Sequence, residues 1–100
     1  MPSLDETRAD AFEHFARRFL GRAAARAETE LDARFNPRVL DSIDLAHHNE
    51  GLIGLENLCS NLYEFEIEVT DEERSALLAF ADAWQLGDRD RKIIDLLERR

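Results

Sequence analysis

Apolar residues recur along most of the chain at the three- and four-residue spacing of helix faces. The clearest early stripe is aromatic and is predicted to pack in the core. It consists of Phe12, Phe15 and Phe19. Ser3 and Glu6 have the spacing of a capping box, which predicts that this helix begins there. Gly21 interrupts the pattern, and the spacing beyond it leaves open whether residues 4–35 form one helix or two.

A second helix is predicted to begin at Asn36 and Pro37, because Asn is a favourable N-cap and proline fits the first helical position. Its apolar face is formed by Val39, Leu40, Ile43 and Ala46. His47 and His48 fall in its last turn, where the helix dipole favours a positive side chain.

A third helix has the best amphipathic pattern in the chain. Its apolar side consists of Leu52, Leu55, Leu58, Cys59 and Leu62, and its polar side of Glu56, Asn57, Ser60, Asn61 and Glu64. Ile53 departs from the pattern, because at 100° per residue it points about 160° away from Leu55. Either a small bundle covers this helix on two sides, or Ile53 is an exposed anchor for a partner. Gly54 favours close approach of another helix.

Acidic and apolar residues alternate strictly after this helix, in the order Glu64, Phe65, Glu66, Ile67, Glu68 and Val69. An extended chain would send the glutamates to one side and the apolar groups to the other. Because the sequence offers no companion strand, the segment is interpreted as one short extended connector, at about 64–70, that plugs the helix layer. Addition of its edge to a partner's sheet is the secondary interpretation.

Two more helices complete the predicted fold. Thr70 and Glu73 form a capping box for a helix that runs from Asp71 toward Leu86, with Gly87 as its C-terminal stop. Asp88 is expected to cap a last short helix, whose apolar face is Ile93, Ile94 and Leu97.

These patterns predict an all-α fold, a compact bundle of four or five helices that forms a single helical domain over residues 1–100. A chain of 100 residues, 44% of them apolar, suits one modest core. The first residues lack the basic and apolar segments of a signal peptide, and no run of eighteen apolar residues occurs, so we expect a cytoplasmic protein that does not contact a membrane. The single cysteine, Cys59, excludes an internal disulfide and is expected to be a buried, reduced thiol.

Charge is distributed unevenly. The formal net charge is -9, and the 35 residues from Val39 to Glu73 contain no Lys or Arg. The same stretch contains ten acids: Asp41, Asp44, Glu50, Glu56, Glu64, Glu66, Glu68, Asp71, Glu72 and Glu73. Such a surface repels nucleic acid, whose binding depends on Lys and Arg, and attracts a basic protein. We therefore expect a protein partner and no direct contact with nucleic acid.

The sequence favours a binding protein over an enzyme. His47 and Glu50 could share a helix face, but the adjacent His47 and His48 point about 100° apart, and metal sites need three or four convergent ligands. No glycine-rich phosphate loop and no nucleophile motif is present. We expect no catalytic residue, no metal and no cofactor; a pocket with convergent His47, His48 and Glu50 would favour an enzyme.

The segment Asn49–Thr70 resembles the central segment of the MafI family of bacterial immunity proteins. In that family a glutamate and small residues open a helix that ends in Leu-Tyr-Glu and leads into an extended acidic and apolar stretch. The less generic matching residues are Glu50, Glu56, Tyr63 and Glu64, and the similarity covers roughly residues 36–86. The resemblance implies a small cytoplasmic protein, encoded beside a secreted polymorphic toxin, that binds the toxin domain and prevents self-killing.

Charge and resemblance agree on one expected function. Many such toxins are nucleases with basic clefts, so an acidic immunity protein would neutralise its toxin by stoichiometric occlusion. The expected partner-binding residues are Glu50, Ile53, Glu56, Asn57, Ser60, Tyr63, Glu64, Phe65, Glu66 and Glu68, of which Tyr63, Ile53 and Phe65 are the expected anchors. We assume a monomer. One alternative is an acidic helical adaptor that sequesters a basic partner, such as a transcription factor. In another alternative the acidic surface only keeps the protein soluble, and the protein then has no tightly bound partner.

Overall fold

The computed structural model describes residues 4–23 and 29–99, and these residues form an all-α bundle of five α-helices, with 3-10 conformation in the segment after the first. The elements are α1 (Leu4–Ala16), η1 (Arg17–Phe19), α2 (Thr29–His47), α3 (Gly51–Glu64), α4 (Asp71–Ala83) and α5 (Asp88–Leu96). The predicted fold class is therefore confirmed. Ser3, the first residue of the predicted N-terminal capping box, lies outside the described residues.

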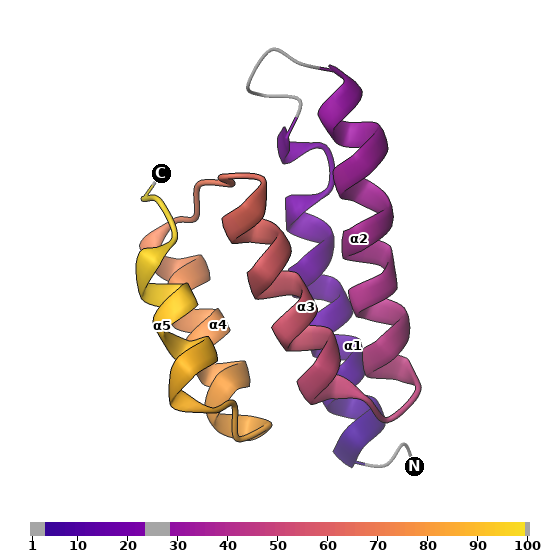
Figure 1. Ribbon diagram of the computed structural model, residues 1–100. Helices are drawn as coiled ribbons and strands as arrows, with labels where there is room; N and C mark the ends of the chain where they lie inside the picture. Colours follow the sequence, from indigo (N-terminus) through magenta and orange to yellow (C-terminus); the bar gives the residue numbers. More distant parts are fainter. Residues whose placement is uncertain (1–3, 24–28, 100) are drawn as a thin grey trace.

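The five helices run alternately up and down through the molecule (Figure 1). In this view α3 occupies the middle, with α2 on one side and the α4–α5 pair on the other, and α1 passes behind α3. The predicted aromatic stripe is buried and joins the first helix to the fourth. The ring centroid of Phe12 lies 5.4 Å from that of Phe80 and 5.4 Å from that of Trp84, both in edge-to-face contact.

The second helix begins earlier than predicted. Helix α2 starts at Thr29 and contains Pro37 in its interior, so the predicted start at Asn36 and Pro37 is wrong. Residues 4–35 do not form one helix, because α1 ends at Ala16 and Gly21 adopts a positive φ of 80°. The Asn36 side chain accepts a hydrogen bond of 2.9 Å from the Gly21 amide, across the turn, instead of capping its own helix.

Helices α2 and α3 approach closely at Gly54, as the sequence predicted. A Cβ atom at this position would lie 2.6 Å from the backbone oxygen of Ser42. Beside this contact, Asn57 Nδ2 donates a hydrogen bond of 2.9 Å to Ser42 Oγ, which itself donates to the Arg38 carbonyl. The polar side of α3 is thus used partly for packing, and Asn61 is buried there as well.

Three of the turns after helices contain non-glycine residues with a positive φ: Asn49, Glu66 and Gln85. Helix α4 ends at Ala83, so Gly87 is not its stop; Gly87 is the N-cap of α5, and Asp88 is the first residue of that helix and not its cap. Because Glu64 belongs to α3 and Glu66 has a φ of 53°, the predicted extended connector begins later than residue 64. Its alternating burial is nevertheless present, since Ile67 and Val69 are buried while the three glutamates are exposed.

The predicted capping box at the start of α4 is present and is part of a buried ion pair. Glu73 is fully buried, and its carboxylate accepts hydrogen bonds from the Thr70 amide and from both terminal nitrogens of Arg22, at 2.7 and 2.9 Å. Burial alone would raise the pKa of Glu73, but the bonds from Arg22 and Thr70 outweigh it and hold that pKa below its usual value. This pair ties the turn after η1 to the start of α4.

Candidate functional site

A solvent-facing strip runs along α3 and carries four of the ten predicted partner-binding residues, namely Ile53, Ser60, Tyr63 and Glu64. Ile53 and Tyr63 are 50% and 52% exposed, and they lie ten residues apart, which corresponds to about 15 Å along the helix axis. Ser60 and Glu64 lie on the same strip and are also exposed. Helices α2 and α5 pack on two sides of α3, as one interpretation predicted, but this coverage leaves Ile53 half exposed, so burial in the bundle does not account for it.

The α2–α3 hollow lies on one side of this strip. It is an open depression of about 370 Å³, lined by Asp41, Asp44, Leu45, Ile53 and Asn57. Asn57 contributes to the lining while its amide group is bonded to Ser42, so its position is fixed by the packing of the two helices.

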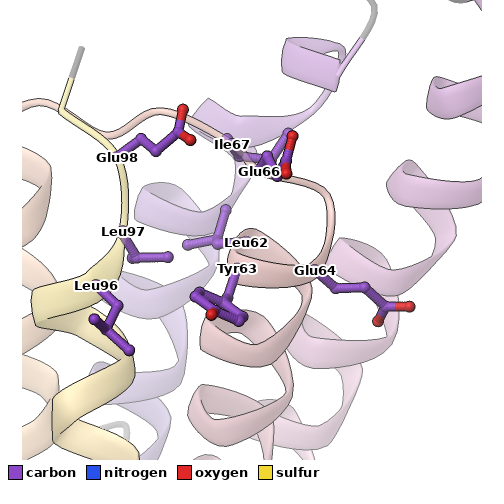
Figure 2. Close-up of a pocket in the computed structure, with 8 residues that line it drawn as sticks. All are labelled: Leu62, Tyr63, Glu64, Glu66, Ile67, Leu96, Leu97 and Glu98. Carbon is purple, nitrogen blue, oxygen red and sulfur yellow. The ribbon is translucent and has the colours of Figure 1, made fainter.

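The α3–α5 groove lies on the other side and is the larger of the two, at about 430 Å³ (Figure 2). Its lining residues are Leu62, Tyr63, Glu64, Glu66, Ile67, Leu96, Leu97 and Glu98. The Tyr63 ring and the Leu96 side chain extend into the space between the two helices, whereas the Glu64 carboxylate is turned away from α5. Leu62, Ile67 and Leu97 are buried and form an apolar floor.

Both walls of this groove are held by hydrogen bonds. On the α3 side, the amides of Glu66 and Ile67 donate to the carbonyls of Tyr63 and Leu62, which closes the end of the helix. On the α5 side, the Arg74 guanidinium donates to the carbonyls of Ile94 and Leu97. The Val69 amide donates a bond of 2.8 Å to the Glu98 carbonyl and so links the two walls.

The acids of the arginine- and lysine-free stretch differ in how far the fold neutralises them. Four face a basic group: Asp44 at His48 (3.5 Å), Asp71 at Arg99 (3.9 Å), Glu72 at Arg18 (3.8 Å) and Glu73 at Arg22 (2.7 Å). Hydrogen bonding to the Asp44 carbonyl and the nearby carboxylate raise the pKa of His48, which favours its charged form. Five have no ion-pair partner among the side chains that the structure describes: Asp41, Glu50, Glu56, Glu64 and Glu68. The uncompensated charge therefore concentrates around α3.

The other predicted site residues have mixed placements. Glu50, Glu66 and Glu68 are exposed at the two ends of α3 and in the connector, and Glu56 is half-buried. Phe65 is half-buried and packs against the core, with its ring centroid 5.3 Å from that of Phe35. Phe65 therefore does not belong to the exposed strip.

Sequence reasoning missed Leu96 and Glu98, which complete the α3–α5 groove. Leu96 is 62% exposed, the largest exposed fraction among the large apolar side chains whose burial the structure describes. The sequence carried the same indication for Leu96 as for Ile53, since each is an apolar residue outside the apolar face of its own helix. In the last helix that face is formed by Ile93, Ile94 and Leu97. Leu40 and Leu52 were predicted on apolar faces but are exposed at 44% and 37%.

The groups considered for chemistry are dispersed. Cys59 is a free, buried thiol, as predicted, and burial raises its pKa to about 12. His47 ends α2, as predicted, and its Nε2 lies 2.7 Å from Glu13 Oε1 of α1. In the described residues, no three His, Cys, Asp or Glu side chains are grouped as metal ligands would be. None of the helices in ranges 4–23 and 29–99 combines the length and the apolar character needed to span a bilayer.

Comparison of the chain with protein-family models, with curated proteins and with solved structures finds no match. The site must therefore be interpreted from its own geometry.

Proposed function

We propose that this chain is a cytoplasmic immunity protein that binds a cognate secreted toxin domain and neutralises it by stoichiometric occlusion. The observation that carries this proposal is the exposed strip of α3, where large apolar side chains and uncompensated carboxylates occur together. Ile53 and Tyr63 have the size and exposure of interface anchors, and the acids beside them favour a basic partner surface. The sequence resemblance to the MafI family supports the same class of partner.

In this proposal the protein acts by covering its partner and not by catalysis. Carboxylates around α3 would steer a basic toxin surface toward the strip, and electrostatic steering of this kind raises association rates toward about 10⁸–10⁹ M⁻¹s⁻¹ at low salt. The apolar side chains would then lose their contact with water and slow dissociation. A nuclease toxin offers a basic cleft for such an acidic surface because it must bind phosphates.

The proposal is tested by co-expression of this chain with the variable C-terminal domain of a secreted protein encoded beside it. We expect cells that produce both proteins to grow, cells that produce the toxin domain alone to stop growing, and the two proteins to co-purify in a 1:1 complex. If cells die as readily with this chain as without it, the immunity function is wrong. If the captured partner is instead a basic transcription factor, the adaptor function replaces it.

Reversal of three charges is expected to slow association with the toxin domain. Replacement of Glu64, Glu66 and Glu68 by lysine should lower the association rate about tenfold at low salt and flatten its dependence on ionic strength, with a smaller effect on dissociation. Stopped-flow or surface-based kinetics at several salt concentrations would measure this.

The matched control makes the same change in net charge outside the α3 strip, by lysine at Asp10 of α1, Glu72 of α4 and Asp88 of α5, all of which are exposed. Equal slowing by the two triple variants would show that only net charge matters. Unchanged kinetics in the first variant would remove these glutamates from the encounter surface.

A further inference from the structure

The geometry points to the α3–α5 groove as the docking site for an arginine side chain of the partner, held with its stem along Leu96 and the apolar floor and its guanidinium against the Tyr63 ring, on the side of the acidic rim that includes Glu98. This inference rests on the proposed function and names the chemistry of the contact. It concerns one groove of the molecule and not the acidic surface as a whole.

The groove has the two parts that an arginine side chain requires. The three-carbon stem of arginine is apolar and packs on apolar surface, and the floor of Leu62, Ile67 and Leu97 with the exposed Leu96 supplies that surface. The planar guanidinium is charged and stacks on aromatic faces, for which Tyr63 is available at the groove (Figure 2). Carboxylates from both walls, Glu66 after α3 and Glu98 after α5, supply the negative charge.

Charge complementarity selects this occupant. None of the described residues that line the groove is basic, and the chain as a whole carries a net charge of -9. A purely apolar side chain would leave Glu98, which has no ion pair with a described side chain, without a partner, whereas a guanidinium offers its carboxylate charge-assisted hydrogen bonds. Arginine is favoured over lysine because only the guanidinium combines stacking with bidentate bonding.

The protein already contains the same chemistry in its interior. The Arg22 guanidinium lies 4.7 Å from the centroid of the Phe19 ring and makes a bidentate pair with the Glu73 carboxylate. An aromatic ring and a carboxylate thus already hold one arginine in this fold. The α3–α5 groove presents these groups at the surface, and its walls are fixed by the bonds of Arg74 and Val69, so little ordering is needed when the partner binds.

The inference is tested on the full chain with short peptides as probes. The peptide acetyl-Gly-Ala-Arg-Ala-Gly-amide is compared with its citrulline analogue, which keeps the shape and loses the charge, and with its lysine analogue. In NMR titrations we expect the arginine peptide to shift the signals of Tyr63, Leu96 and Leu97 saturably. The citrulline peptide should bind at least fivefold more weakly, and the lysine peptide more weakly than arginine. Equal binding of arginine and citrulline, or equal shifts at Asp41 and Asp44, would overturn the inference.

Two substitutions and one control locate the contact. E98Q is expected to weaken arginine binding at least threefold, whereas the control D95N, which removes an exposed carboxylate of α5 outside the lining, should leave it unchanged. Y63L keeps apolar surface and should remove the preference for arginine over lysine. If D95N weakens binding as much as E98Q, the effect is general electrostatics and the groove is not the site. Sedimentation of the protein, without and with the arginine peptide, tests a second occupant. If the protein associates with itself and the peptide disrupts this association, the groove binds a second copy of the chain and the inference is overturned.

Co-expression separates the failure of this inference from the failure of the proposed function. If the unmodified chain protects cells and the E98Q/Y63A double variant, confirmed as folded by circular dichroism, protects them equally, the groove inference is wrong and the immunity function stands. If the unmodified chain gives no protection, the immunity function fails, whatever the peptides show.

Discussion

Replacement of Glu73 by alanine is expected to lower the free energy of unfolding by about 3–5 kcal/mol, because it leaves the Arg22 guanidinium without its bidentate partner in a largely buried position. The substitution also removes the side chain that bonds the Thr70 amide, and loss of helix capping costs about 1 kcal/mol in other proteins. Domains are commonly stable by only about 5–15 kcal/mol, so this change would remove a large share of the total. Urea denaturation followed by circular dichroism at pH 7 measures it.

Glu72 offers a matched control in the same helix turn. Its side chain is 83% exposed and lies 3.8 Å from Arg18, so its replacement by alanine should cost less than about 1 kcal/mol. If replacement of Glu72 lowered the free energy of unfolding as much as replacement of Glu73, the role assigned to the buried pair would be contradicted.

The ion pair of Arg22 and Glu73 also makes the free energy of unfolding depend on pH. The pKa of Glu73 is lower in the folded protein than its ordinary value, so its stabilisation is present above the unfolded pKa of about 4.3. This stabilisation is lost as the pH falls from there through the lower folded value, because the carboxyl group is then protonated in both states. The E73Q variant should lack this part of the acid-induced loss of stability, and an identical pH profile for both proteins would contradict it.

Replacement of Gly54 by alanine is expected to lower the free energy of unfolding by about 1–3 kcal/mol, against the intrinsic preference of helices for alanine, which is worth about 1 kcal/mol in the opposite direction. The added methyl group would lie 2.6 Å from the Ser42 carbonyl oxygen, and a backbone atom cannot rotate out of the way as a side chain can. Helices α2 and α3 must then separate, which also weakens the bond between Asn57 and Ser42.

Gly87 provides the control for this experiment. A Cβ atom there would have no neighbour within 4 Å, and the residue is the N-cap of α5 with an ordinary negative φ. Its replacement by serine should raise stability by a few tenths of a kcal/mol. Thermal unfolding of both variants distinguishes them, and a stabilised Gly54 variant would show that the helices are less closely packed at Ser42 than described.

Helix faces and caps that depend on local spacing could be predicted from the sequence. The buried residues Phe12, Phe15 and Phe19 follow a simple periodic pattern, and so does the apolar side of α3. The capping box of Thr70 and Glu73 is a local signal and was predicted for the same reason. Close contact at Gly54 was predictable because a glycine within a helix lacks a side chain that could keep a neighbour away.

Features decided by distant contacts could not be predicted. Asn36 and Pro37 are favourable at a helix start, yet α2 continues through them, since Phe35 is buried against Phe65 and Asn36 bonds the turn at Gly21. The cost of an interior proline, about 3 kcal/mol, must therefore be offset by tertiary packing. Helix α4 ends through Gln85 and not Gly87, because burial of Leu86 fixes the turn.

The candidate site was predicted only in part for the same reason. Ile53 departed visibly from the pattern of its own helix, and Tyr63 was predicted as an anchor because it is a large aromatic residue among acids. The second wall of the groove comes from α5, and the sequence gives no indication that Leu96 and Glu98 lie beside Tyr63. Phe65 appeared suitable as an anchor from its acidic neighbours, but its ring is used in the core.

The aromatic contacts between α1 and α4 have a consequence for synthesis of the chain on the ribosome. Phe12 meets Phe80 and Trp84, residues about seventy positions later, and Arg22 meets Glu73. While the chain is being translated, α1 can pack against α2, but the part of its apolar face that carries Phe12 and Phe15 lacks its contacts with Phe80 and Trp84 until the fourth helix has emerged. The N-terminal half therefore cannot complete its core alone, and nascent chains expose aggregation-prone apolar surface until late in translation. Helix α4 completes the core, and α5 supplies the second wall of the α3–α5 groove. The core and the groove are therefore completed together, late in translation.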